Sequence, residues 1–292
     1  MRTTLGLIRR NIRVYYRDRG QVVLSLIAPL ILLLLYILFL GNLQVDTLKA
    51  SLPGASDEEI DAFVYTWVFA GMVMITTVTT GLSALNTFVE DRIFGRFKDF
   101  RVSPINPVQL IAGYLVASCL IAFVMSLIVF IVGLVVVSVS YDSFPGWKDV
   151  FASVAWTALM CLGFSSMSAL IVTFIRSSGA FTSLSVIVGT VVGFLAGAYI
   201  PLGTMSDGVV NALNVLPFSQ SAMLLRNPLA GVPLTDLTQN VPGAYDTISE
   251  YFGFQLMVGS RTITEAMVAV VLLAMTIVCG ALGALRMQRS IN

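Results

Sequence analysis

The sequence contains no histidine, only three cysteines among 292 residues, and few charged side chains. Without imidazole the chain has no Ser-His-Asp or Cys-His nucleophile, no histidine proton relay and no histidine-containing zinc site. Cys119, Cys161 and Cys279 are too far apart for a metal site made of cysteine alone. These absences exclude most of the chemistry of soluble enzymes, and we expect no catalytic residue, no metal and no cofactor in this chain.

Charged residues are also scarce in this sequence. Charged residues make up 11% of the chain and hydrophobic residues 57%, whereas an ordinary soluble domain carries about a quarter charged residues. So large an apolar excess cannot be hidden inside one soluble core. The net charge of only +1 also argues against a nucleic-acid partner. The composition therefore predicts a membrane protein.

Long apolar stretches divide the chain into spans. About 20 mostly apolar residues are needed to cross a bilayer as a helix, and six stretches meet that requirement. The third is shortened at its start because Pro104 and Pro107 disfavour regular helix. We expect an all-α fold in one domain, 1–292, with transmembrane helices at 22–40, 62–89, 108–140, 150–175, 178–200 and 263–286.

Two segments outside the spans have patterns of their own. Residues 1–20 place apolar side chains at helical spacing among arginines, which predicts an amphipathic helix lying at the membrane interface. Residues 201–261 hold five prolines but remain apolar, so we expect a re-entrant helical hairpin on the outer side. Capping-box spacing recurs at Ser56–Glu59 and Thr262–Glu265, where it predicts helix starts.

The basic residues predict the orientation in the membrane. Short loops rich in arginine and lysine stay in the cytoplasm, and thirteen of the seventeen basic residues lie in segments 1–21, 90–101, 176 and 286–292. Both termini are therefore predicted to be cytoplasmic, in a multi-pass protein of the plasma membrane.

Two patterns inside the spans admit a functional and a structural interpretation. A polar stripe on the second span fits a path for an amphipathic solute, but its hydroxyl groups can also bond back to their own helix. It consists of Met72, Thr76, Thr79, Thr80, Ser83 and Asn86. Gly189, Gly193 and Gly197 form a small-residue series on the fifth span, which suits a dimer interface or ordinary packing within one chain.

The connection between the second and third spans, 90–104, carries the most informative motif. Aromatic residues recur every third position among charges of both signs, which is typical of a short surface helix gripped by a partner's groove. The residues expected to make that contact are Glu90, Asp91, Arg92, Phe94, Arg96, Phe97, Asp99 and Phe100.

This connection, with Gly95, Asp99-Phe100 and Ser103-Pro104, resembles the charged-Gly-Asp-Phe-x-x-Ser-Pro signature of ABC-2 type exporter permeases (type V exporters). The similarity continues at Gly113-Tyr114, at 197–203, and at Leu216-Pro217-Phe218 with Arg226. It departs at Arg96-Phe97-Lys98, where many members have Thr-Leu-Glu.

 The resemblance implies a permease subunit that forms a homodimer and sits on two cytoplasmic ATPase subunits through residues 90–104, the coupling helix. The chain has no Gly-x-x-x-x-Gly-Lys-[Ser/Thr] loop, so ATP and Mg²⁺ are expected in the ATPase partner. The resemblance also implies export of hydrophobic or amphipathic, drug-like or lipid-like compounds, along a route between the first, second and fifth spans.

Two other classes of function would make different demands on the sequence. A stand-alone channel or sensor would use residues 90–101 to dock a cytoplasmic signalling protein. A membrane-embedded enzyme would need converging acidic, histidine or cysteine groups, which the spans lack. A neighbouring gene for an ATPase without membrane spans would favour the exporter.

Overall fold

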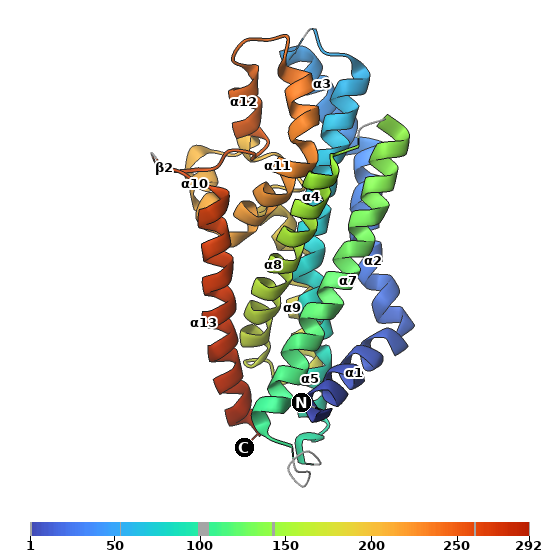
Figure 1. Cartoon of the computed structure of the whole chain (residues 1–292), viewed down its shortest axis with the longest axis vertical. Helices are drawn as coiled ribbons and strands as arrows, with labels where there is room; N and C mark the ends of the chain where they lie inside the picture. Colours follow the sequence, from blue (N-terminus) through green and yellow to red (C-terminus); the bar gives the residue numbers. More distant parts are fainter. Residues whose placement is uncertain (1, 53, 99–104, 142–143, 260, 292) are drawn as a thin grey trace.

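The computed structural model describes residues 2–52, 54–98, 105–141, 144–259 and 261–291. It is an elongated helical bundle, with one short hairpin of strands near one end (Figure 1). The elements are α1 (Arg2–Arg17), α2 (Arg19–Leu35), the π-helix η1 (Tyr36–Leu40), α3 (Gly41–Ser51), α4 (Asp57–Ala84), α5 (Asn86–Ile93), α7 (Pro107–Tyr141), α8 (Trp147–Val172), α9 (Ser178–Leu195), the 3₁₀-helix η2 (Leu202–Thr204), α10 (Asp207–Val215), α11 (Pro217–Thr238), α12 (Ala244–Tyr251), β1 (Met257–Val258), β2 (Arg261–Thr262) and α13 (Glu265–Ile291).

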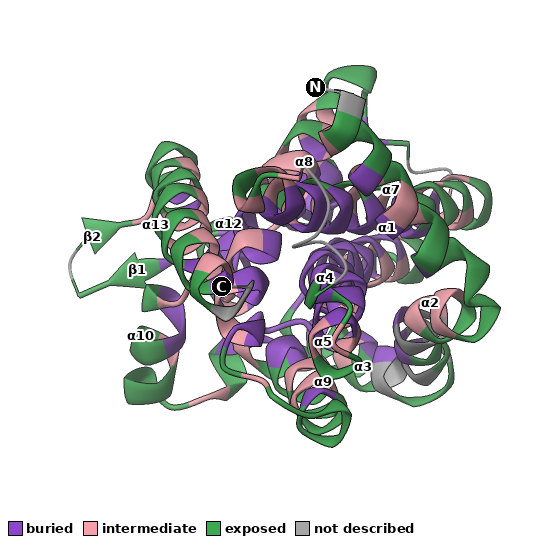
Figure 2. Cartoon of the chain, turned by 90° about the horizontal axis from the view of Figure 1, so that it is seen from below, coloured by how far each residue is buried: buried purple, intermediate pink, exposed green. Residues whose placement is uncertain are grey.

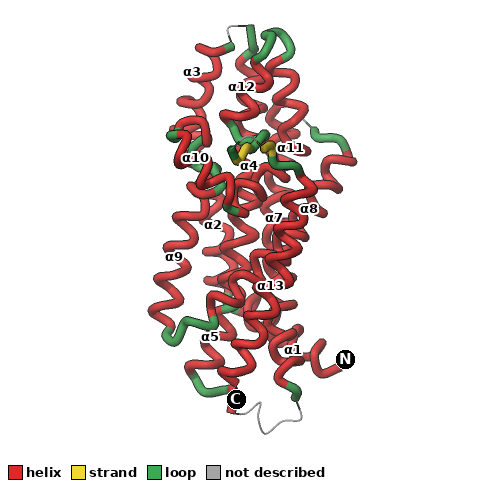
Figure 3. The backbone as a smooth tube through the Cα atoms, turned by 90° about the vertical axis from the view of Figure 1, so that its left-hand side faces the viewer, coloured by secondary structure: helices red, strands yellow, loops and turns green. Residues whose placement is uncertain are grey.

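The bundle has two distinct ends. Both chain termini lie at the end that carries α1 and α5, called the α1 end below (Figure 1). The short helices α10 and α12 and the strands gather toward the opposite end, called the hairpin end (Figure 3). The two strands pair antiparallel, with Met257 opposite Thr262.

Five helical segments of the described chain are long and apolar enough to span a membrane. They are Asp57–Ile93, Pro107–Tyr141, Trp147–Val172, Ser178–Leu195 and Glu265–Arg289. Helices α10 and α11 are long and apolar enough to span a membrane only when they are taken together, and the chain bends by 84° between them. The predicted all-α membrane fold is therefore confirmed.

The structure corrects the predicted limits of two spans. The first predicted span, 22–40, is divided between α2 and the π-helix η1, and the helical path continues into α3. The fifth, predicted at 178–200, ends at Leu195, because Gly197 has a φ of +60° and turns the chain back. Both changes come from local backbone geometry that hydropathy does not encode.

Helix α4 forms the centre of the bundle. The apolar window of its span is 89% buried, and α7, α8 and α11 pack around it. Seen along the bundle, buried residues cluster on α4 and its neighbours, whereas α2, α10 and α13 present exposed surface (Figure 2). Trp67 and Phe63 of α4 are fully buried against Phe252.

Helix starts are set by local capping. Ser56 and Glu59 form the predicted capping box at the start of α4. The second predicted box is wrong, because Thr262 belongs to β2 and Thr264 instead accepts the hydrogen bond from the Met267 N–H. Glu265 accepts a hydrogen bond from the Asn227 side chain.

Candidate functional site

The connection after α4 begins with a tightly closed helix end. Gly95 has a φ of +71°, the left-handed conformation that glycine adopts most readily. The Arg96 N–H donates to the Asp91 carbonyl at 2.9 Å, and the Gly95 N–H donates to the Arg92 carbonyl at 3.3 Å. This pair of bonds is a Schellman motif, which ends α5 and turns the chain sharply.

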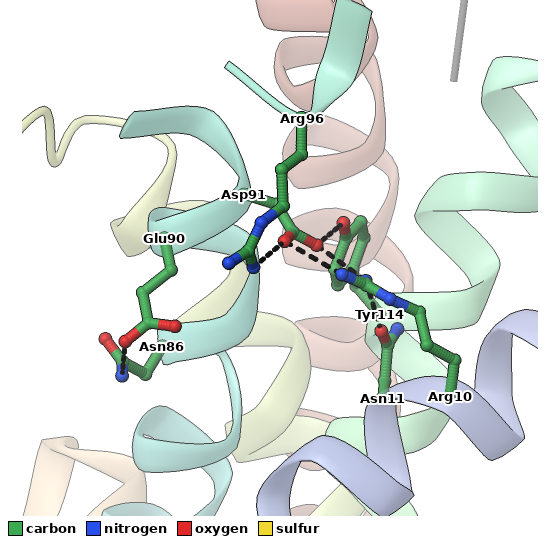
Figure 4. Close-up of polar contacts among 7 residues, drawn as sticks. All are labelled: Arg10, Asn11, Asn86, Glu90, Asp91, Arg96 and Tyr114. Carbon is green, nitrogen blue, oxygen red and sulfur yellow. Dashed lines mark hydrogen bonds and ion pairs between the residues drawn. The ribbon is translucent and has the colours of Figure 1, made fainter. Parts of the chain in front are cut away.

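Asp91 lies at the centre of a polar cluster at the α1 end (Figure 4). Its side chain is fully buried. Arg10 of α1 donates two hydrogen bonds to its carboxylate, at 2.6 and 2.9 Å. Arg96 donates at 2.8 Å and the Tyr114 hydroxyl of α7 at 2.5 Å. One carboxylate therefore joins α1, α5 and α7.

Close packing holds α1 on α7 beside this cluster. A Cβ atom at Gly113 would lie 2.8 Å from the Leu7 Cβ atom, so the absence of a side chain lets the two helices approach. Leu7 is itself buried. Hydrogen bonding to Asp91 raises the pKa of Arg10 above its ordinary value, despite partial burial. The Asp91 cluster is a charged joint between helices that are distant in sequence.

The predicted aromatic contacts are divided by the turn at Gly95. Phe94 is 66% exposed and carries the Arg96 guanidinium over its ring. Phe97 does not present its ring at the surface, which corrects the expectation of an exposed knob, because it packs on Phe88 at 5.5 Å between ring centroids. Asp99 and Phe100 lie outside the described residues.

The two other predicted residues of the connection bind within the chain. Glu90 accepts a hydrogen bond from the Asn86 side chain at 3.0 Å, away from the Asp91 cluster (Figure 4). Arg92 donates to the carbonyl groups of Thr173 and Ile175 at the end of α8.

Two neighbouring hollows run along the face formed by α2, α4 and α9. Their volumes are about 400 and 630 Å³. The first is lined mainly by apolar residues such as Leu32 and Ile75, and the second by a mixture of polar residues such as Gln21 and Thr182 and apolar residues such as Phe181. Because both share Thr79, Ser185, Val186 and Gly189 in their lining, they form one groove, called the α2–α9 groove.

The predicted polar stripe divides between this groove and the interior. Met72, Thr79, Ser83 and Asn86 line the groove. Thr76 and Thr80 do not: both are fully buried, and the Thr76 hydroxyl donates to the Met72 carbonyl. At 100° per residue, Thr80 points well away from the face that Met72 and Thr79 share.

The glycine series is not one open face. Gly189 has no atom near the position of a Cβ and lines the groove. Gly193 is covered by the ring of Tyr199, whose hydroxyl donates to the Gly189 carbonyl at 3.1 Å. Gly197 lies beyond the end of α9. The three glycines therefore do not form one continuous face, because the chain folds back over its own helix, and the contact at Gly193 is packing within one chain.

Arg226 fixes the hairpin end to the bundle. Its side chain is fully buried and donates to the carbonyl groups of Ala196 and Gly197 at 3.1 and 2.7 Å. The guanidinium also lies over the Trp67 ring. The positive charge thus faces the carbonyl end of α9, which carries partial negative charge.

Several of these partners carry no signal in the sequence. Arg10 is one of five arginines in α1, and nothing local marks it as the partner of Asp91. Tyr114 is marked in the sequence only by the family resemblance at Gly113-Tyr114. Among the residues that the structure describes, no group of three His, Cys, Asp or Glu could hold a metal ion.

A family model described as ABC-2 family transporter protein matches residues 41–285. A search of curated proteins gave no match. The match covers most of the chain and agrees with the helical membrane fold. The chain belongs to the ABC-2 family transporter proteins, and it is a membrane permease of an ABC transporter, the transport subunit and not the ATPase.

Proposed function

We propose that this permease exports hydrophobic or amphipathic compounds across the plasma membrane, using ATP hydrolysed by a separate nucleotide-binding subunit. The Asp91 cluster is the observation that carries this proposal, since it ties the connection after α4 to both α1 and α7. ATP and Mg²⁺ belong to the ATPase subunit, which family membership implies as a partner.

The α1 end is the cytoplasmic side in this proposal. The arginine-rich segments of the chain lie there, as the positive-inside rule requires. Phe94 and Arg96 are exposed beside the buried Asp91, so a protein that grips them also holds the joint. When the ATPase moves the connection after α4, the hydrogen bonds of Asp91 to Arg10 and Tyr114 move α1 and α7 with it.

The α2–α9 groove is the proposed substrate path. Its polar part lies at the Gln21 and Asn86 end and its apolar part farther along α4, at Met72 and Leu32. A cargo with a polar head and an apolar body matches that gradient. Asp18 is the one charged residue among those lining the groove, so anionic cargo is disfavoured because a buried negative charge needs a positive partner.

A second copy of the chain is the proposed cover for this groove. Helix α9 is only 17% buried within the chain. Val186, Ile187 and Val191 expose apolar surface on it, and the open backbone at Gly189 allows a close helix approach. Two protomers that meet through α9 would enclose the path between them.

Copurification tests the ATPase contact. Phe94→Ala should reduce recovery of the ATPase with the tagged permease, because it removes an exposed aromatic anchor. Phe144→Ala is the matched control, since Phe144 is an exposed phenylalanine outside the connection. Equal ATPase recovery with wild type and Phe94→Ala would contradict this contact, and absence of any ATPase would favour the channel alternative.

A further inference from the structure

We propose that the α1 end binds the phosphate of an anionic phospholipid through Arg92, Arg176 and Arg286. These residues, called the arginine triad, come from α5, the α8–α9 connection and α13. The proposal concerns a lipid site and goes beyond the transport function.

The triad converges on one short segment. Arg92 donates from Nη1 to the carbonyl groups of Thr173 and Ile175 at 3.0 and 3.1 Å. The Arg286 guanidinium carbon lies 3.8 Å from the centroid of the Phe174 ring. Arg176 follows directly in sequence. Two arginines from other elements therefore flank the segment that carries the third.

The charges of the triad are not balanced within the described chain. Arg92 experiences the positive charge of both Arg176 and Arg286. The ion pairs among the described residues involve Asp91 and Asp57, and no member of the triad takes part in them. A phosphate would relieve this repulsion, and guanidinium groups bind phosphate oxygens in a planar, two-pronged geometry.

Apolar surface beside the triad points to a lipid. Leu282 and Leu285 of α13 are 50% and 58% exposed, and Leu282 precedes the exposed Arg286 by about one helical turn. Gly283 faces α8, where a Cβ would lie 3.2 Å from the Leu170 nitrogen, so the exposed Arg286 lies at the border between the α8 contact and the exposed face. An acyl chain along the exposed face places its phosphate at Arg286.

Lipid binding by the purified full chain tests the site. The probes are fluorescent phosphatidylglycerol and phosphatidylcholine in detergent micelles, with soluble glycerol phosphate as competitor. Wild type should prefer phosphatidylglycerol. The double variant Arg176→Gln with Arg286→Gln should bind it about 30-fold more weakly, which corresponds to about 1 kcal/mol for each arginine at an anionic surface.

Two control variants separate the site from a general effect of charge. Arg261→Gln removes an exposed positive charge from β2 at the other end of α13 and should leave binding unchanged. The double variant Arg176→Lys with Arg286→Lys should retain most of the preference, which also guards against a folding defect in the glutamine variant.

Several results would overturn the proposal. Equal wild-type affinity for both lipids is one, and unchanged phosphatidylglycerol binding in the glutamine variant is another. Full competition by glycerol phosphate would assign the triad to a soluble phosphate. Loss of ATPase recovery with lipid binding intact would assign it to protein docking.

Discussion

Asp91→Asn should release α1 from the bundle. The substitution preserves side-chain size but removes the charge that Arg10, Arg96 and Tyr114 share. Arg96 is 46% exposed, so its loss resembles that of a surface ion pair, about 0.2–1 kcal/mol. Loss of a charge-assisted bond from Arg10 adds about 1.5–3 kcal/mol. Because only the Arg10 bond crosses to α1, its loss alone should shift the docking equilibrium of α1 by about 10- to 100-fold.

The distance between two spin labels, one on α1 and one on α7, reports this release directly. Labels at Leu5 of α1 and Val116 of α7 suit the purpose, because both side chains are exposed, after the native cysteines are replaced. Wild type should give one narrow distance distribution, and Asp91→Asn should add a longer one. Asp57→Asn is the control, since Asp57 pairs with Lys49 at an exposed site. A distance distribution in Asp91→Asn equal to that of wild type would refute the claim that Asp91 holds α1 on the bundle.

Three further substitutions, two of them paired with a control at another glycine, test close contacts by thermal unfolding of the purified protein. Gly113→Ala should destabilise the docking of α1, whereas Gly6→Ala, with open space around it, should be neutral or stabilising. Gly193→Ala should lower the unfolding temperature because it meets the Tyr199 ring, and Gly189→Ala should not; equal effects would contradict the folded-back tyrosine. Arg226→Met should cost about 2–4 kcal/mol by leaving buried carbonyl groups unpaired, and a stability equal to wild type would contradict its anchoring role.

Local signals in the sequence predicted local structure well. The capping box at Ser56 and Glu59 needs only residues within one helical turn, and it is present. The spans follow from hydropathy because the bilayer sets their length. The bent hairpin was indicated by prolines within an apolar segment, and the structure has an 84° bend between α10 and α11.

Contacts between distant segments could not be predicted in the same way. Arg10 and Asp91 are separated by 81 positions, and pairing them requires the docking of α1. Tyr199 covers Gly193 because the chain reverses at Gly197, which breaks a spacing argument that assumes continuous helix. Phe97 turns inward for a similar reason, after the turn at Gly95.

ATP-dependent transport is the most direct test of the central claim. The permease and its ATPase would be reconstituted together in inverted vesicles, and accumulation of an amphipathic fluorescent compound measured with and without ATP. The account predicts accumulation that requires ATP and both subunits, and that falls in Asp91→Asn. Equal flux without ATP, or full accumulation without the ATPase, would contradict it.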